Sequence, residues 1–213
     1  MTRLGFSVLD IRAERHAASP TLMARLRITE DSGEVVHALA LRAQVRIAPQ
    51  RRTYDAAEKE ALVDLFGEPD RWGTTLNSLL WMHCTAMVPG FTGETEVDLQ
   101  LPCTYDTEVA ASKYMHGLSG GEIALSFLFN GSVFTKGTTG FSVTQVPWDA
   151  EAGYRMPAAI WREVMDHYFP NSGWLRLDRD TLATLSRYKS RRGLATWEAT
   201  FDMLLKEAGE EGA

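Results

Sequence analysis

The sequence predicts a β-rich α+β fold: an antiparallel β-sandwich, immunoglobulin-like or similar, with one inserted helix and a C-terminal three-helix segment packed on it. Three observations support this prediction. Apolar and polar residues alternate through most of residues 1–148, which is the pattern of half-buried strands. One stretch within that region, residues 55–66, has helical spacing instead. After Trp148 the apolar period changes from two to about 3.6 residues, the period of amphipathic helices.

The strand alternation is clearest between residues 35 and 47. Leu39, Leu41 and Val45 fall on one face of this segment, whereas Arg42 and Arg46 fall on the other. Further strand candidates cover residues 4–11, 20–29, 94–103, 121–129 and 140–146. Turn-forming clusters such as "EDSGE", "FTGE" and "TKGTTG" punctuate the region. Because strands and helices do not alternate as βαβ units, we expect consecutive antiparallel strands in a sandwich.

The inserted helix is predicted over residues 55–66. Asp55 is a suitable N-cap residue, and Glu58 completes a capping box three residues later. An apolar stripe follows at positions 61, 62, 65 and 66. Gly67 can adopt the left-handed conformation that ends a helix, and Pro69 prevents the helix from continuing.

Three helices are predicted in residues 149–208. The first begins at Pro157, where a missing N–H has no cost. The second ends in a basic turn before Gly193, and the third begins after the N-cap residue Thr196. Each helix carries an apolar stripe that must be buried, so we expect the segment to pack on the sandwich core as part of one cooperative unit. Residues 209–213 are expected to fray.

The composition is that of an ordinary globular protein: 45% of the 213 residues are hydrophobic and 23% are charged. The formal charge of −6 argues against nucleic-acid binding, although residues 1–52 contain nine arginines, no lysine and five acids. Two cysteines cannot form a disulfide framework. The first residues lack the apolar stretch of a secretory signal, and no run of about 18 apolar residues occurs. We therefore expect a cytoplasmic, reduced protein.

The segment "LLWMHCTAMVPGF", residues 79–91, raises the question of a metal or reactive-thiol site. In a strand, His83 and Cys84 point to opposite faces, and Cys84 shares its face with apolar residues, which favours a structural role for the thiol. The alternative is a metal site built from His83, Cys103 and His116. That site would depend on the fold, because the paired-ligand spacings of zinc sites are absent. Our main expectation is that the protein uses no metal and no cofactor.

No catalytic residue is predicted. The sequence lacks the nucleophile-elbow, P-loop and dinucleotide-binding motifs. An unrecognised hydrolase is an alternative, because paired acids can perform glycosidic chemistry and acids cluster around one predicted hairpin. These acids are Glu94, Glu96, Asp98, Asp106 and Glu108. Acids that alternate along a strand are typical of its solvated face, which makes the hydrolase the less favoured interpretation.

Six arginines are the predicted partner-binding residues. Four lie on the polar faces of two predicted strands, and two follow the second strand. They are Arg25, Arg27, Arg42, Arg46, Arg51 and Arg52. If the two strands are neighbours, the guanidinium groups share one surface, and arginine is suited to bidentate recognition of carboxylates or phosphates. The alternatives are a solvated sheet face neutralised by acids elsewhere, or a site for an anionic small ligand or nucleic acid.

Several segments together resemble a bacterial family of unknown function. They are "FSVLDI", "PTLMARLRI", "ALALRAQVRIAPQRR", "LFGEPDRWG", "PGFTGETEVDLQLPCTYD", "KYMHGLSGGEI", "LFNGSVF", "VPW" and "MDHYFPNSGWLRL", so the likeness covers nearly the whole chain. The resemblance implies that the gene for this protein lies beside genes for NiFe-hydrogenase subunits and their maturation factors. It implies no activity. Together with the arginines, it leads us to expect a non-catalytic accessory protein that binds a hydrogenase subunit or maturation factor. A small-ligand or metal carrier and an unrecognised hydrolase are the alternatives.

Overall fold

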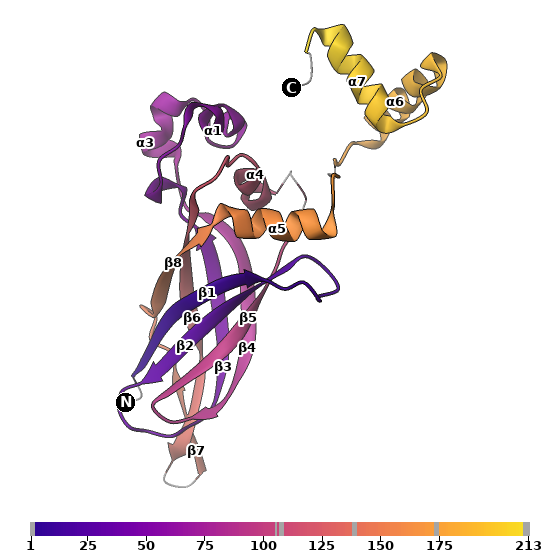
Figure 1. The fold of residues 1–213 in the computed structure, drawn as a ribbon. Helices are drawn as coiled ribbons and strands as arrows, with labels where there is room; N and C mark the ends of the chain where they lie inside the picture. Colours follow the sequence, from indigo (N-terminus) through magenta and orange to yellow (C-terminus); the bar gives the residue numbers. More distant parts are fainter. Residues whose placement is uncertain (1–2, 105, 107–108, 138–139, 173–174, 211–213) are drawn as a thin grey trace. The chain divides into compact units, whose positions relative to one another are not determined.

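The computed structural model describes residues 3–104, 106, 109–137, 140–172 and 175–210. It divides the chain into two compact units, residues 1–174 and residues 175–213. The described part of the first unit contains the strands β1–β8 and the helices α1–α5, and that of the second contains α6 and α7 (Figure 1). The sequence places the division at residue 148 instead, and the packing of α6 and α7 on the sandwich core stays a prediction.

The strands of the first unit form two antiparallel sheets. The three-stranded sheet has the order β1 (Leu4–Ala13), β2 (Thr21–Glu30), β5 (Glu94–Pro102). The five-stranded sheet has the order β4 (Leu79–Phe91), β3 (Val36–Ile47), β6 (Glu122–Gly137), β7 (Gly140–Gln145), and β8 (Glu151–Pro157) also pairs with β6. Each pairing is antiparallel. The predicted β-rich sandwich is therefore confirmed.

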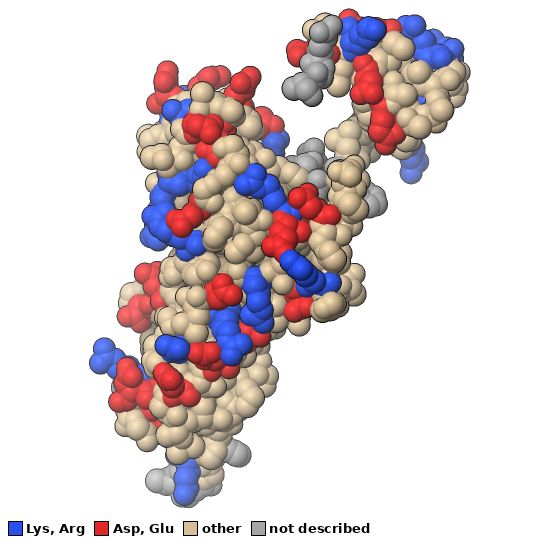
Figure 2. All heavy atoms as spheres, in the orientation of Figure 1, with Lys and Arg blue, Asp and Glu red and all other residues tan. Residues whose placement is uncertain are grey.

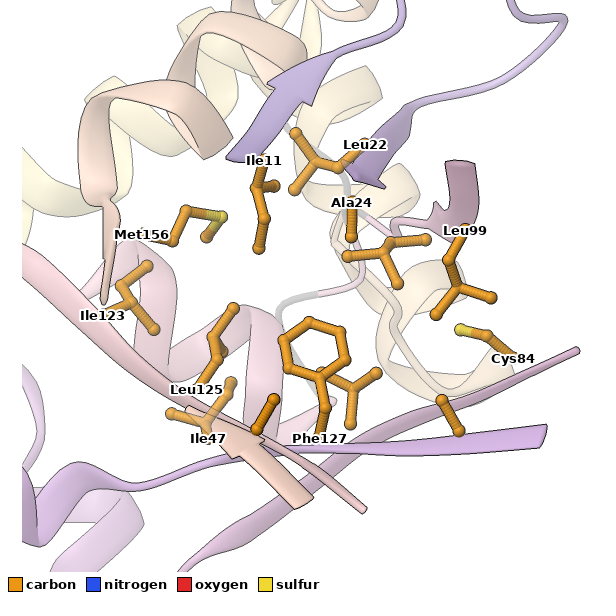
Figure 3. Packing of buried hydrophobic residues seen from close by; sticks show 14 of the residues in the cluster. Ile11, Leu22, Ala24, Ile47, Cys84, Leu99, Ile123, Leu125, Phe127 and Met156 are labelled. Carbon is orange, nitrogen blue, oxygen red and sulfur yellow. The ribbon is translucent and has the colours of Figure 1, made fainter. Parts of the chain in front are cut away.

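The inner faces of the two sheets meet in one apolar core. Figure 3 shows Ile11, Leu22, Ala24 and Leu99 of the three-stranded sheet lying opposite Ile47, Cys84, Ile123, Leu125 and Phe127 of the five-stranded sheet. The alternation predicted for β2 and β3 is confirmed, since their predicted inward residues are at most 2% exposed, whereas Leu80 on β4, predicted to share the inner face with Cys84, is 48% exposed because the β3–β4 register shifts between Val45 and Arg46. Phe6 and Phe129 stack across the two sheets with ring centroids 4.4 Å apart.

The insertion between β3 and β4 is a small helical lobe. It contains η1 (Pro49–Arg51), α1 (Ala56–Ala61), α2 (Val63–Phe66), η2 (Pro69–Arg71) and α3 (Trp72–Thr75). The predicted capping box of Asp55 and Glu58 is confirmed. The single predicted helix is instead two short ones that meet at the fully buried Leu62, and Gly67 has a positive φ without being in the left-handed helical region. An added Cβ at Gly117 would lie 2.7 Å from Leu62 Cδ2, so the lobe is held close to the turn after α4.

Strand β8 and helix α4 also differ from the sequence prediction. Strand β8 occupies the start of the region predicted as helical. The sequence did not indicate this strand, because only Ala152, Tyr154 and Met156 alternate there before a strong helical pattern begins. Helix α4 (Ala110–His116) was not predicted, since it has seven residues and no side-chain N-cap. The helix predicted from Pro157 is confirmed as α5 (Ala158–Tyr168), with Pro157 as its N-cap residue.

The second unit is a pair of helices, α6 (Arg179–Arg192) and α7 (Trp197–Ala208). The predicted caps are confirmed: Gly193 ends α6 in the left-handed conformation, and Thr196 accepts a hydrogen bond from the N–H of Ala199. Among the described residues 175–210, no hydrophobic side chain is buried, and Leu182 and Leu205 are 44% and 48% exposed. In the part of the chain that the structure covers, no helix has the length and apolar character needed to cross a membrane.

The fully buried Phe127 provides a test of the sandwich core. We expect Phe127→Ala to lower the free energy of unfolding by about 3–5 kcal/mol, because it removes a large side chain from between the sheets. Leu128→Ala is a matched control, because the neighbouring Leu128 is only partly buried and lies on the other face of β6. Urea unfolding followed by circular dichroism measures both variants. Equal losses in the two variants would contradict the assigned faces of β6.

Candidate functional site

The outer face of the three-stranded sheet is a ladder of ion pairs. Arg25 Nε and Arg27 Nη2 lie 2.8 Å and 2.9 Å from the two carboxylate oxygens of Glu96, and Arg12 Nη2 lies 2.9 Å from Asp98 Oδ2. Hydrogen bonds from Arg25 and then Arg27 lower the pKa of the Glu96 carboxyl. Figure 2 shows acidic and basic side chains interleaved over these strands. The arginines of β2 are therefore neutralised within the molecule.

The same ladder accounts for two of the acids considered for hydrolysis. Glu96 and Asp98 lie opposite Arg27 and Arg25 in the β2–β5 register. They point from β5 toward solvent-exposed guanidinium groups and pair with them. Glu108 lies outside the described residues. This geometry gives the two carboxylates a structural role on a solvated face.

The predicted single arginine surface is not formed. It required the strands of Arg25 and Arg42 to be neighbours, but β2 and β3 belong to different sheets. Because the sheets pack inner face to inner face, their outward side chains lie on opposite sides of the sandwich. Arg46 on β3 donates hydrogen bonds to Ser78, with Nη2 2.8 Å from Oγ. The condition that the two strands are neighbours is not met, and the sequence could not decide it because strand pairing is not a local property.

Arg42 stands on the outer face of the five-stranded sheet without an acidic neighbour. It is exposed, and within the described residues its side chain has no hydrogen bond or ion pair. Its cross-strand neighbours are Thr85 on β4 and Asn130 on β6, and His83 and Met87 are diagonal to it on β4. Met87 is 69% exposed. We call these five residues the Arg42 patch.

Acids are nearly absent from the strands that carry this patch. Neither β3 nor β4 contains an aspartate or a glutamate, and β6 contains one only at its first residue, Glu122. The described surface around Arg42 thus combines an unneutralised cation with an exposed thioether and small polar groups. Such a mixture is suited to contact with a carboxylate beside an apolar group on another molecule.

Arg52, by contrast, is part of a buried clamp. Its side chain is 10% exposed and that of Glu58 is 3% exposed, and Arg52 Nη2 lies 2.6 Å from Glu58 Oε1. Arg52 Nη1 also donates to the carbonyl oxygens of Gly120 and Glu122. Glu58 accepts a further hydrogen bond, 3.0 Å long, from the N–H of Ser119. The clamp joins the helical lobe to the turn that begins β6.

An open hollow lies beside this clamp. It has a volume of about 730 Å³ and is lined by Gln50, Arg51, Arg52, Thr53, Gly121, Glu122 and Arg155. We call it the η1 hollow. Figure 2 shows basic side chains gathered on the flank of the molecule below α1 and α3. Arg155 Nη1 lies 3.8 Å from Glu122 Oε2, and both side chains are more than half exposed.

Tyr54 and Tyr114 join the helical lobe to α4. The Tyr54 hydroxyl donates to the carbonyl oxygen of Pro49 at 2.7 Å and lies 2.8 Å from the Tyr114 hydroxyl. Burial raises the pKa of both phenols, so they stay neutral at physiological pH. Their hydrogen bonds, together with edge contacts to Trp72 and Phe66, fasten the lobe to α4.

The three residues of the alternative metal site do not converge. His83 is exposed on β4, Cys103 follows β5, and His116 at the end of α4 packs edge-on against Trp161. Burial lowers the pKa of His116. Within the described ranges, no group of three histidine, cysteine or acidic residues is placed to hold a metal ion. The predicted opposite faces of His83 and Cys84 are confirmed, since Cys84 is only 5% exposed.

Sequence reasoning missed Arg155, Glu122, Asn130 and Met87. Arg155 lies on β8, which was not predicted, and it contacts Glu122 only through the β6–β8 pairing. Asn130 joins Arg42 through the β3–β6 register. The alternation of β4 was visible in the sequence and places Met87 outward, but nothing local indicated that Met87 lies beside Arg42.

The two thiols provide a test of burial. Burial raises the pKa of Cys84 to about 11 and that of Cys103 to about 12. At pH 8 only a trace of either thiol is therefore ionised, and the thiolate is the reactive species. We expect no reaction of the native protein with Ellman's reagent over an hour and reaction of two thiols in urea. Rapid reaction of one native thiol would show an accessible, activated cysteine.

The clamp provides a second test. Arg52→Ala leaves the buried Glu58 carboxylate without its cation, so we expect a loss of about 3–5 kcal/mol in unfolding free energy. Arg25→Ala removes an exposed arginine that also pairs with a carboxylate, and we expect it to change the urea midpoint little. Similar midpoints for the two variants would contradict the structural role of Arg52.

Solved structures show only distant likeness to this chain. A β-glucosidase from Kluyveromyces marxianus is 9% identical, with a TM-score of 0.29, over 73% of this chain and 15% of that one. β-Glucosidase 3B from Thermotoga neapolitana is 14% identical, with a TM-score of 0.25, over 72% and 17%. AggA, the major subunit of an Escherichia coli adherence fimbria, is 7% identical, with a TM-score of 0.27, over 73% and 94%. These scores support no argument about fold or function.

The family comparison is more specific. No curated protein matches the chain. One family model matches all of residues 1–213, the span over which the sequence resembles a bacterial family of unknown function. The chain therefore belongs to the family of unknown function DUF6084.

Proposed function

We propose that this protein is a non-catalytic accessory factor that binds another protein through the Arg42 patch. The partner we favour is a NiFe-hydrogenase subunit or maturation factor, which is what the resemblance of the sequence implies. The protein acts by holding its partner during assembly and performs no chemical step on it.

The observation that carries this proposal is the unneutralised charge of Arg42. Arginine is enriched at binding hot spots and methionine at interfaces, because a guanidinium group pairs with carboxylates while the thioether adapts to apolar surfaces. The corresponding arginines on the opposite sheet are already paired with Glu96. Of the two described sheets, the five-stranded one therefore offers a cation, Arg42, that an acidic partner can engage without breaking an existing ion pair.

Affinity purification from the native host tests the proposal. The tagged protein is compared with Arg42→Glu and with Met87→Ser, and co-purified proteins are identified by mass spectrometry. We expect Arg42→Glu to remove the specific partner and Met87→Ser to reduce its recovery severalfold, because one change reverses the charge and the other removes apolar contact area.

Arg25→Gln is the matched control, since it neutralises an exposed arginine on the opposite sheet. We expect it to retain the partner, and all three variants to keep melting temperatures close to that of the unmodified protein. Unchanged partner recovery with Arg42→Glu would reject the Arg42 patch. Loss of the partner with Arg25→Gln as well would indicate a general charge effect.

A further inference from the structure

We infer that the η1 hollow is a binding site for the phosphate group of a small molecule. This inference does not depend on the proposed function, because the hollow and the Arg42 patch are separate sets of residues.

Arg52, which lines the hollow, is held in place by the buried clamp. Arg52 is held by Glu58, by the carbonyl oxygens of Gly120 and Glu122 and by that of Thr53. Gly121 beside it has a φ of 69°, which disfavours any other residue, and an added Cβ would lie 3.7 Å from Arg52 Nη2. The Arg52 guanidinium group is therefore held in place by four hydrogen-bond acceptors. A site formed in this way needs little reorganisation when a ligand binds.

Two further cations line the hollow and are less constrained. Arg51 is exposed at the end of η1 and, within the described residues, its side chain has no hydrogen bond or ion pair. Arg155 reaches the hollow from β8 and has Glu122 as its ion-pair partner at 3.8 Å. These arginines come from separate elements and line the same cavity. Gln50 and Thr53 add polar side chains to its wall.

The number and arrangement of the cations favour phosphate. Three guanidinium groups from β8 and the β3–α1 segment line the hollow, and a tetrahedral phosphate can accept hydrogen bonds from several directions, whereas a carboxylate accepts them in one plane. The volume of about 730 Å³ is that of a small-molecule site. The space around the arginines thus accommodates the remainder of a phosphorylated metabolite.

Glu122 is the internal competitor for this site. Its carboxylate and the guanidinium group of Arg155 are both more than half exposed and 3.8 Å apart, so their pairing is weak. A bound phosphate would displace Glu122 from Arg155 and lie beside its negative charge. Removal of that charge should therefore strengthen anion binding, whereas removal of either exposed arginine should weaken it.

Titration calorimetry with inorganic pyrophosphate at low ionic strength tests the inference on the full-length protein. We expect one site per chain, a loss of affinity of about tenfold in Arg51→Gln and in Arg155→Gln, and a severalfold gain in Glu122→Gln. Arg25→Gln is the control, since it removes an exposed arginine that lies outside the hollow, and its affinity should equal that of the unmodified protein.

Three outcomes would overturn the inference: no heat in the unmodified protein at millimolar pyrophosphate, an equal loss of affinity in Arg25→Gln, or no gain of affinity in Glu122→Gln. The affinity purification described above, repeated with Arg155→Gln, distinguishes two kinds of ligand. One is a free small molecule, and the other is a phosphorylated or acidic group on a bound protein. We expect recovery to be unchanged, because the site serves a free small molecule. Loss of the partner together with pyrophosphate binding would assign the hollow to the partner interface instead.

Discussion

The contact between the inner faces of the two sheets determines the rest of this structure. Side chains alternate along a strand, so burial of Leu39, Leu41 and Val45 forces Arg42 and Arg46 outward. A shift of one residue in the β3 register would bury two guanidinium groups and expose the core residues between them. The apolar core therefore fixes the position of each surface group on which the proposals depend, although none of these groups contributes to the core.

The helical lobe and the η1 hollow depend on a second interaction, the buried pair of Arg52 and Glu58. Glu58 has two functions in one place, because its carboxylate completes the capping box of α1 and accepts hydrogen bonds from Arg52 and Ser119. The start of α1 and the turn before β6 are thus held by the same carboxylate. This explains why Arg52, which looks like an exposed basic residue in the sequence, is a structural residue that shapes the hollow without being free itself.

Local patterns predicted the elements, whereas the site required knowledge of pairing. The alternation of β3 and the caps of α1, α6 and α7 are encoded within a few residues, and the structure confirms them. Arg25 and Arg42 have equivalent positions in their strands, and no local feature distinguishes them. They differ because β2 pairs with the acidic strand β5, whereas β3 pairs with β4, which has no acid. Such distant pairings are not visible in one sequence.

The outer faces of the two sheets differ in whether their arginines are paired with acids. If the five-stranded sheet served only as a solvated surface, an acid at position 85 would stabilise it, because Thr85 lies opposite Arg42 just as Asp98 lies opposite Arg25. The chain uses this device on β5 and omits it on β4. Arg42, which has no ion-pair partner among the described residues, lies beside Met87, which is mostly exposed. A neutral polar pair at these two positions would stabilise the sandwich equally well. Contact with another molecule supplies a physical reason for this arrangement, since only an external carboxylate and apolar group would complete it.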